Sequence, residues 1–269
     1  MMKEAMPTIP MWTMLAALLC TTTAHAKLRS AAIDYKQGDT ILEGYLVYDD
    51  AVKGKRPGVL IAHEWTGVGP YVKGRAEQLA SLGYVALAAD IYGKGIRPQT
   101  GEEAAKVAAI YRNDRALMRE RMKAALGALR GHDLVDTNRI AAIGYCFGGT
   151  CALELARSGA DIAGVVSFHG GLDTPSPPDA RNIKCKVLAL HGADDPFVPP
   201  AQVAAFEQEM REAGVDWQLH IYGGAVHSFT NPASGNDPSR GAAYNERADR
   251  RSWQAMRMFF DEIFGAPRR

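Results

Sequence analysis

A cysteine set between two glycines is the first residue of this sequence that could do chemistry. The segment Gly144-Tyr145-Cys146-Phe147-Gly148 follows the pattern G-x-S-x-G, with cysteine in the serine position. In that pattern a strand turns sharply into a helix, and the glycines are needed because a Cβ there would strike the adjoining strand or helix. The central thiol then lies at a helix N-terminus, where positive potential favours its thiolate. Cys146 is therefore a candidate nucleophile, although a buried structural cysteine in a glycine-rich turn would leave the same pattern.

A cysteine nucleophile needs a base that accepts its proton and an acid that fixes the tautomer of the base. Of the seven histidines, His227 follows the last predicted strand through residues 223–226, a flexible loop that can bring an imidazole over the edge of a sheet. The acid is best placed after the predicted strand 186–190, where Asp194 and Asp195 both stand. The resulting chain order of nucleophile, aspartate and histidine is the order found in α/β-hydrolases.

The elements that must position these residues alternate along the chain. Short apolar runs are typical of strands buried on both faces, and strands are predicted over residues 57–62, 83–89, 140–143, 162–168, 186–190 and 217–222. Helices are predicted over residues 71–82, 101–111, 113–129, 149–157, 201–213 and 245–264. This alternation indicates an α/β fold with a doubly wound, mostly parallel sheet and helices on both faces. In such a sheet the ligand crevice lies at the carboxyl ends of the strands, where all the candidates stand.

The N-terminal part of the fold is predicted to be an antiparallel hairpin at one edge of the sheet. Residues 31–36 and 40–48 both read as strands, and they flank the turn sequence Gln37-Gly38-Asp39. No internal repeat, low-complexity tract or linker interrupts the chain that follows. We therefore expect residues 27–269 to form a single domain.

The composition limits the classes of function. The 269 residues are 47% hydrophobic and carry a formal net charge of +1, which gives no electrostatic reason to expect a nucleic acid or a membrane surface as partner. The sequence has no metal-ligand spacing, phosphate-binding loop or dinucleotide fingerprint, so no cofactor is predicted. A small molecule is the expected partner, and the oligomeric state stays open.

Residues 1–26 read as a secretory signal peptide. Lys3 precedes the apolar run 11–20, which is too short to span a bilayer, and Ala24-His25-Ala26 provides a small-residue cleavage site. Cleavage after Ala26 predicts a mature protein in the periplasm or outside the cell. The alternative is a cytoplasmic protein whose N-terminal tail has no fixed structure.

Removal of this signal would leave three cysteines, Cys146, Cys151 and Cys185. An odd number cannot be paired entirely within the chain, so at least one thiol is free or bonded elsewhere. No disulfide framework is implied. In an oxidising compartment a reactive Cys146 would be open to oxidation.

Four motifs in this order together resemble the dienelactone hydrolase family, whose members are cysteine-dependent α/β-hydrolases with a Cys-Asp-His triad. They are AHEWTG at residues 62–67, GYCFGG at 144–149, HGADDPFVP at 191–199 and GAVHSF at 224–229. The likeness extends from about residue 45 to residue 264. It implies the α/β-hydrolase fold, and it implies hydrolysis of carboxylic ester, lactone or thioester bonds in small substrates.

The resemblance also implies roles for individual residues. It implies a triad and an oxyanion hole made of the nucleophile Cys146, the acid Asp195 rather than Asp194, the base His227 and the backbone N–H groups of Trp65 and Phe147. Asp195 is preferred to its neighbour because it occupies the H-G-x-x-D position. Glu64 would contact the Cys146 thiol and help to ionise it when substrate binds.

The positions that would bind a substrate carboxylate depart from the family pattern. Members that act on dienelactones use two arginines, one of them shortly after the catalytic histidine, and here Asn231 stands at that place. Asparagine cannot replace a planar bidentate donor, so the sequence argues against dienelactone specificity. For the other arginine, Arg97 is the preferred candidate because it belongs to a loop at a strand end. Arg112 and Arg115 are expected to lie on a solvated helix face.

Two other classes of function stay open at this stage. One is a non-catalytic binding protein that keeps the fold, since a fold alone does not establish an activity. The other is a cysteine acyltransferase or peptidase. No residue of the candidate triad is missing, and this favours an enzyme over a binding protein.

Overall fold

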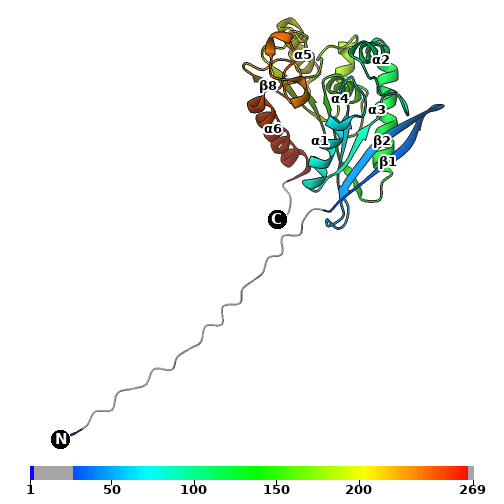
Figure 1. The fold of residues 1–269 in the computed structure, drawn as a ribbon. Helices are drawn as coiled ribbons and strands as arrows, with labels where there is room; N and C mark the ends of the chain where they lie inside the picture. Colours follow the sequence, from blue (N-terminus) through cyan, green and yellow to red (C-terminus); the bar gives the residue numbers. More distant parts are fainter. Residues whose placement is uncertain (3–26, 266–269) are drawn as a thin grey trace.

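The computed structural model describes residues 1–2 and 27–265, so the predicted signal sequence lies almost entirely outside the described residues. Figure 1 shows a layer of strands between two layers of helices. In the described part, the strands are β1 Leu28–Gln37, β2 Thr40–Asp49, β3 Arg56–Ala62, β4 Val85–Ala89, β5 Val135–Tyr145, β6 Gly164–Phe168, β7 Lys186–Gly192 and β8 Trp217–Tyr222. The helices are α1 Pro70–Ser81, α2 Gly101–Asn113, α3 Arg115–Arg130, α4 Phe147–Arg157, α5 Pro200–Ala213 and α6 Glu246–Phe264.

The strands form one sheet in the order β1-β2-β4-β3-β5-β6-β7-β8. Strand β2 pairs antiparallel with both of its neighbours, and every other adjacent pair is parallel. The β1–β2 hairpin lies at one edge, as the sequence predicted. Parallel strands with helical crossovers bring the carboxyl ends of β3, β5, β6, β7 and β8 to the same edge of the sheet.

Both faces of the sheet are covered, because neighbouring residues of one strand point to opposite faces. Leu60 of β3 belongs to an apolar core shared with helices α2, α3, α4 and α5. Its neighbours Val59 and Ile61 belong to a second core, shared with α1 and α6. The continuous apolar runs of the sequence are therefore explained by burial on both faces, and the predicted doubly wound α/β fold is confirmed.

Strand β5 extends furthest beyond its predicted range. It begins at Val135 rather than at residue 140, and in its mostly polar first half Val135 and Asp136 pair with Arg56 and Pro57 before a shift in register. Backbone pairing does not require apolar side chains, so an apolar pattern could not reveal this half. The connection between β6 and β7 contains a short 3₁₀ helix, Pro177–Asn182.

The turn between β5 and α4 places Cys146 in a strained backbone conformation. Its φ and ψ angles are 55° and −118°, a positive φ that costs a residue with a Cβ roughly 1–3 kcal/mol. The flanking glycines are sterically required. A Cβ on Gly144 would lie 1.8 Å from the Gly148 carbonyl oxygen, and a Cβ on Gly148 would lie 2.2 Å from the Ala62 carbonyl oxygen.

Gly148→Ala is therefore expected to destabilise the protein by at least about 3 kcal/mol, since the new methyl group would have to push β3 and α4 apart. The matched control is Gly74→Ala within α1, where an added Cβ meets nothing within 4 Å. That control should stabilise the helix by about 0.5–1 kcal/mol. Chemical denaturation of both variants would measure the difference, and a Gly148→Ala protein as stable as the wild type would contradict the close approach.

No helix among the described residues is both long enough and apolar enough to cross a membrane.

Candidate active site

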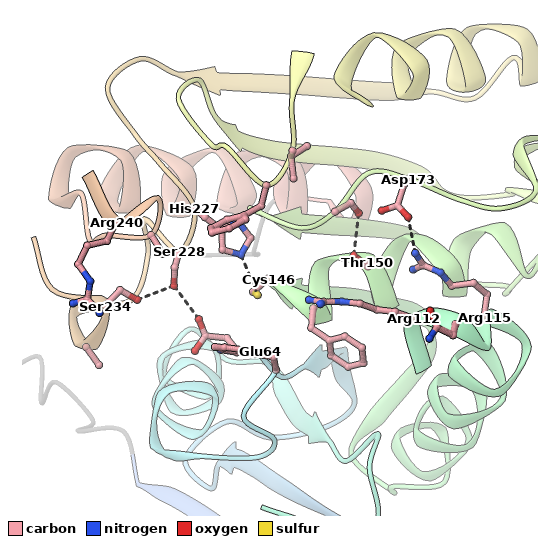
Figure 2. A pocket seen from close by; sticks show the side chains of 18 residues that line it. Glu64, Arg112, Arg115, Cys146, Thr150, Asp173, His227, Ser228, Ser234 and Arg240 are labelled. Atoms are coloured by element: carbon pink, nitrogen blue, oxygen red, sulfur yellow. Dashed lines mark hydrogen bonds and ion pairs between the residues drawn. The ribbon is translucent and has the colours of Figure 1, made fainter. Parts of the chain in front are cut away.

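The structure brings Cys146, His227 and Asp195 together at the carboxyl edge of the sheet. The Nε2 atom of His227 lies 3.1 Å from the Cys146 Sγ atom, and its Nδ1 atom lies 2.8 Å from the Asp195 Oδ2 atom. In Figure 2 the sulfur lies directly against the imidazole of His227. Because Nδ1 faces a carboxylate, Nδ1 carries a proton, and Nε2 is the nitrogen that can accept a proton from the thiol.

Asp195 and Asp194 are adjacent in sequence but differ in environment. The Asp195 side chain is buried, and its second carboxylate oxygen accepts the Phe197 N–H at 2.9 Å. Asp194 is exposed to solvent. The aspartate in contact with His227 is therefore the one that the family resemblance implied.

The loop of His227 is held from both sides by backbone hydrogen bonds. The His227 N–H donates to the Gly241 carbonyl at 3.1 Å, and the His227 carbonyl accepts the Ala243 N–H at 3.0 Å. Phe197 covers the imidazole edge-on, with 5.4 Å between ring centroids. The ring is thus positioned by its own loop and by the loop that carries Asp195.

The charge state of His227 depends on its two partners. Burial by itself would lower the pKa of His227, but the neighbouring Cys146 thiolate and Asp195 carboxylate outweigh it and raise the pKa to about 10. At neutral pH His227 is therefore expected to carry a positive charge between these two side chains.

Glu64 lines the same cavity, but its carboxylate is bonded elsewhere. Its Oε2 atom accepts the Asn231 amide at 2.8 Å, and its Oε1 atom accepts the Ser228 hydroxyl at 3.3 Å. Burial raises the pKa of Glu64, and the two donors partly offset this rise. Among the described residues, the Cys146 sulfur is hydrogen-bonded to His227 and not to Glu64. Sequence reasoning gave Ser228 no role, although Ser228 belongs to the GAVHSF motif.

The two expected oxyanion donors belong to the turns that follow β3 and β5. Phe147 begins α4, where N–H groups have no acceptor within the helix, and Trp65 lies in the turn after β3. The peptide between Glu64 and Trp65 is anchored on its carbonyl side, because the buried His63 ring bonds the Glu64 carbonyl through Nδ1 at 2.5 Å. The Trp65 carbonyl accepts the Tyr92 hydroxyl at 2.8 Å. Both donors line the cavity that contains the sulfur.

This cavity has a volume of about 680 Å³ and carries three arginines, Arg112, Arg115 and Arg240. Figure 2 shows Arg112 and Arg115 on one side of Cys146 and Arg240 on the other. Arg115 is paired with Asp173 at 2.7 Å, and the guanidinium of Arg112 lies over the Phe147 ring, 5.9 Å from its centroid. The expectation that Arg112 and Arg115 lie only on a solvated helix face was wrong, because the start of α3 and the end of α2 form one wall of the cavity.

Arg97 is not among the residues that line the cavity. Its guanidinium donates to the Ile96 carbonyl at 2.8 Å and lies 3.7 Å from Asp90 and 3.9 Å from Glu43. These acceptors hold the side chain beside β2 and β4. Arg112, and not Arg97, therefore lines the cavity.

The three cysteines of the described chain are all free thiols and all buried, but they differ in surroundings. Burial raises the pKa of Cys185 to about 12, and it also raises the pKa of Cys151. Cys146 alone lines the cavity and contacts an imidazole.

A doubly wound sheet with a strained strand-to-helix turn at its carboxyl edge defines the α/β-hydrolase class. The profile of the dienelactone hydrolase family matches residues 42–264. The chain therefore belongs to the dienelactone hydrolase family, and it is a hydrolase.

Solved structures and a curated relative agree with this assignment. The structure named m3DLH is 44% identical with a TM-score of 0.84, covering 88% of this chain and 98% of that one. A dienelactone hydrolase-like promiscuous phosphotriesterase from metagenomic libraries is 42% identical, with the same TM-score of 0.84 and the same coverage of 88% and 98%. A Bradyrhizobium protein named "probable 2-oxo-3-(5-oxofuran-2-ylidene)propanoate lactonase" is 30% identical over 74% of this chain and 84% of its own length.

Proposed function

We propose that this hydrolase cleaves carboxylic ester, lactone or thioester bonds of small substrates through a Cys146–Asp195–His227 triad. The observation that carries the proposal is the continuous contact from the Cys146 sulfur through the His227 imidazole to the buried Asp195 carboxylate, at 3.1 and 2.8 Å. A nucleophile, a base and an orienting acid within hydrogen-bonding distance form the arrangement needed for covalent acyl transfer.

The reaction would proceed in two halves. The Cys146 thiolate attacks the substrate carbonyl, and the N–H groups of Trp65 and Phe147 hold the resulting oxyanion. The imidazolium of His227 then gives its proton to the leaving alkoxide or thiolate, which produces an acyl-cysteine. In the second half, neutral His227 takes a proton from water, the hydroxide attacks the thioester, and the carboxylic acid leaves with regeneration of the thiolate.

Thiol labelling tests the proposal directly, because only one of the three thiols faces the cavity. With limiting iodoacetamide, Cys146 is expected to be alkylated at least about 100-fold faster than Cys151 or Cys185, and activity on an aryl ester should disappear in proportion to the alkylation of Cys146. Peptide mapping by mass spectrometry would locate the label. Full esterase activity after complete alkylation of Cys146 would exclude the mechanism.

The cavity arginines support a preference for substrates that carry an acidic group. Arg112 is exposed toward the cavity, so it can donate to a carboxylate. Arg112→Ala is expected to raise KM for a carboxylate-bearing ester by about 10-fold and to leave KM for a neutral aryl ester nearly unchanged. Arg97→Ala is the matched control, since that arginine lies outside the cavity. Equal effects of Arg112→Ala on both esters would contradict a role in recognising charge.

A second candidate activity is the cleavage of phosphotriesters. The support is the 42% identity, over 88% of this chain, to the dienelactone hydrolase-like phosphotriesterase. The same thiolate would attack phosphorus instead of carbon and would displace an aryl oxide. Release of the phenol from an aryl dialkyl phosphotriester, lost on alkylation of Cys146, would establish this activity, and no release above the blank would dismiss it.

We further propose that residues 1–26 direct export and are removed. The apolar run at residues 11–20 and the Ala24-His25-Ala26 site support this, and β1 begins at Leu28, so cleavage after Ala26 would leave every described strand and helix intact. Expression of the full chain in a bacterium, followed by fractionation and N-terminal sequencing, should give a periplasmic protein that begins at Lys27. A full-length cytoplasmic product would argue for the alternative.

A further inference from the structure

One of the buried histidines, His169, packs against the base of the proposed triad. His169 follows β6, has a φ of 39° although it is not glycine, and is completely inaccessible to solvent. Such a backbone conformation is unfavourable for a residue with a Cβ, so the surrounding structure must hold it in place. The steps of the proposed reaction do not use this ring.

The first contact of His169 is with the turn that carries the nucleophile. The Cys146 N–H points to the Nδ1 atom of His169 at 3.1 Å, and it is shared with the Phe168 carbonyl at 3.0 Å. Because Nδ1 accepts a hydrogen bond, a neutral ring carries its proton on Nε2.

The second contact is with the loop that carries the base. The Nε2 atom of His169 lies 2.7 Å from the hydroxyl of Thr230, three residues after His227. That hydroxyl is 2.5 Å from the Tyr71 hydroxyl, and the Thr230 carbonyl accepts a hydrogen bond from Arg75 at 2.8 Å. Thr230 is therefore anchored on α1 as well as on His169.

The ring of His169 also packs against the base itself. Its centroid lies 5.4 Å from the centroid of His227 and 5.0 Å from that of Phe229, both in edge-to-face geometry. Burial, then the nearby charge of His227, lowers the pKa of His169 well below its ordinary value, so the ring stays neutral. A neutral ring has one donor and one acceptor, and here each of them has a partner on a different loop.

We propose that His169 is a positioning residue that joins the nucleophile turn to the His227 loop and thereby sets the distance between the Cys146 sulfur and the His227 imidazole. This inference rests on the proposed triad and extends it, because it assigns the spacing of nucleophile and base to a third residue. A shift of about 1 Å between reacting groups can reduce a rate by about 100-fold. The expected signature is thus a loss in kcat with little change in KM.

The sharpest test is the pair Thr230→Val and Thr230→Ser. Valine keeps the shape of the side chain but leaves the Nε2–H of His169 without an acceptor, whereas serine restores the hydroxyl. For an activated aryl ester, Thr230→Val is expected to lower kcat by about 10-fold or more at nearly constant KM, and to slow the alkylation of Cys146 by iodoacetamide in parallel. Thr230→Ser should recover most of both rates.

Two further variants separate positioning from general destabilisation. His169→Phe keeps an aromatic ring but loses both hydrogen bonds, and should lower kcat by about 100-fold. Ser252→Ala removes another buried hydroxyl, which donates to the Asp249 carbonyl on α6, and should lower the melting temperature without changing kcat. Each rate is divided by the concentration of folded protein. Thermal denaturation of each variant gives the fraction that is folded at the assay temperature.

The inference is overturned if Thr230→Val keeps the wild-type kcat, if Thr230→Ser loses as much as Thr230→Val, or if the losses appear in KM alone. Its failure can be distinguished from failure of the proposed triad. An inactive Cys146→Ala protein combined with an unaffected Thr230→Val protein would remove only the role of His169. An active Cys146→Ala protein would remove the triad itself.

Discussion

Cys146→Ala is expected to lower kcat for activated aryl esters by at least about 10⁴-fold, the largest effect of any single substitution in this chain. Alanine leaves the cavity, the oxyanion donors and the His227–Asp195 contact in place, but it removes the atom that forms the acyl intermediate. Hydrolysis would then depend on water activated by His227 alone. Steady-state kinetics with the purified protein would measure the loss.

The matched control for this substitution is Cys151→Ala. Cys151 lies one turn into α4, is fully buried and lines no part of the cavity, so its loss should leave kcat unchanged. Mass spectrometry after rapid mixing with substrate adds a second readout, since the wild type should carry an acyl group on Cys146 and the Cys146→Ala protein should carry none. Wild-type rates from the alanine protein would rule out the covalent mechanism.

Asp195→Asn is expected to lower kcat by about 10² to 10⁴-fold, although it hardly changes the size of the side chain. The carboxylate of Asp195 accepts a hydrogen bond from Nδ1–H of His227 and stabilises the imidazolium. An amide can instead donate to Nδ1, which would place the ring proton on Nε2 and leave no base facing Cys146. The same change should lower the pKa of His227, because one of the groups that raise it loses its charge.

Asp194→Asn provides the control for Asp195→Asn within the same loop. Asp194 is exposed and does not contact His227, so this variant should keep nearly full activity. The pH dependence of kcat/KM and an NMR titration of His227 would report both variants. Equal losses from the two substitutions would mean that the loop, and not the carboxylate, supports the reaction.

Much of the fold could be predicted from the sequence because its signals are local. Apolar runs predicted every strand of the described sheet, and helix periodicity predicted the helices between them. The glycine spacing from Gly144 to Gly148 indicated the strained turn. The extent of β5 was missed because Val135 and Asp136 pair with β3 through the backbone, while the side chains of residues 136–139 are polar.

The parts of the site that could not be predicted depend on three-dimensional neighbours. Arg97 and Arg112 both belong to the region between β4 and α3, and sequence alone could not show which guanidinium reaches the cavity. Asp90, directly after β4, and Glu43 in β2 hold Arg97 away from it. Likewise, nothing in the sequence around His169 indicated that its two nitrogens would meet Cys146 and Thr230, which lie 23 and 61 residues away.

The positive φ of Cys146 links the folding stability of this protein to its activity. Glycine is the residue that relieves a positive φ most easily, and glycine has no sulfur. The protein therefore gives up some folding free energy at the one position where a reactive side chain has to project into the cavity. Improvements in heat resistance are then best sought at positions whose side chains do not contact the site, such as Gly74, where an added Cβ meets nothing within 4 Å.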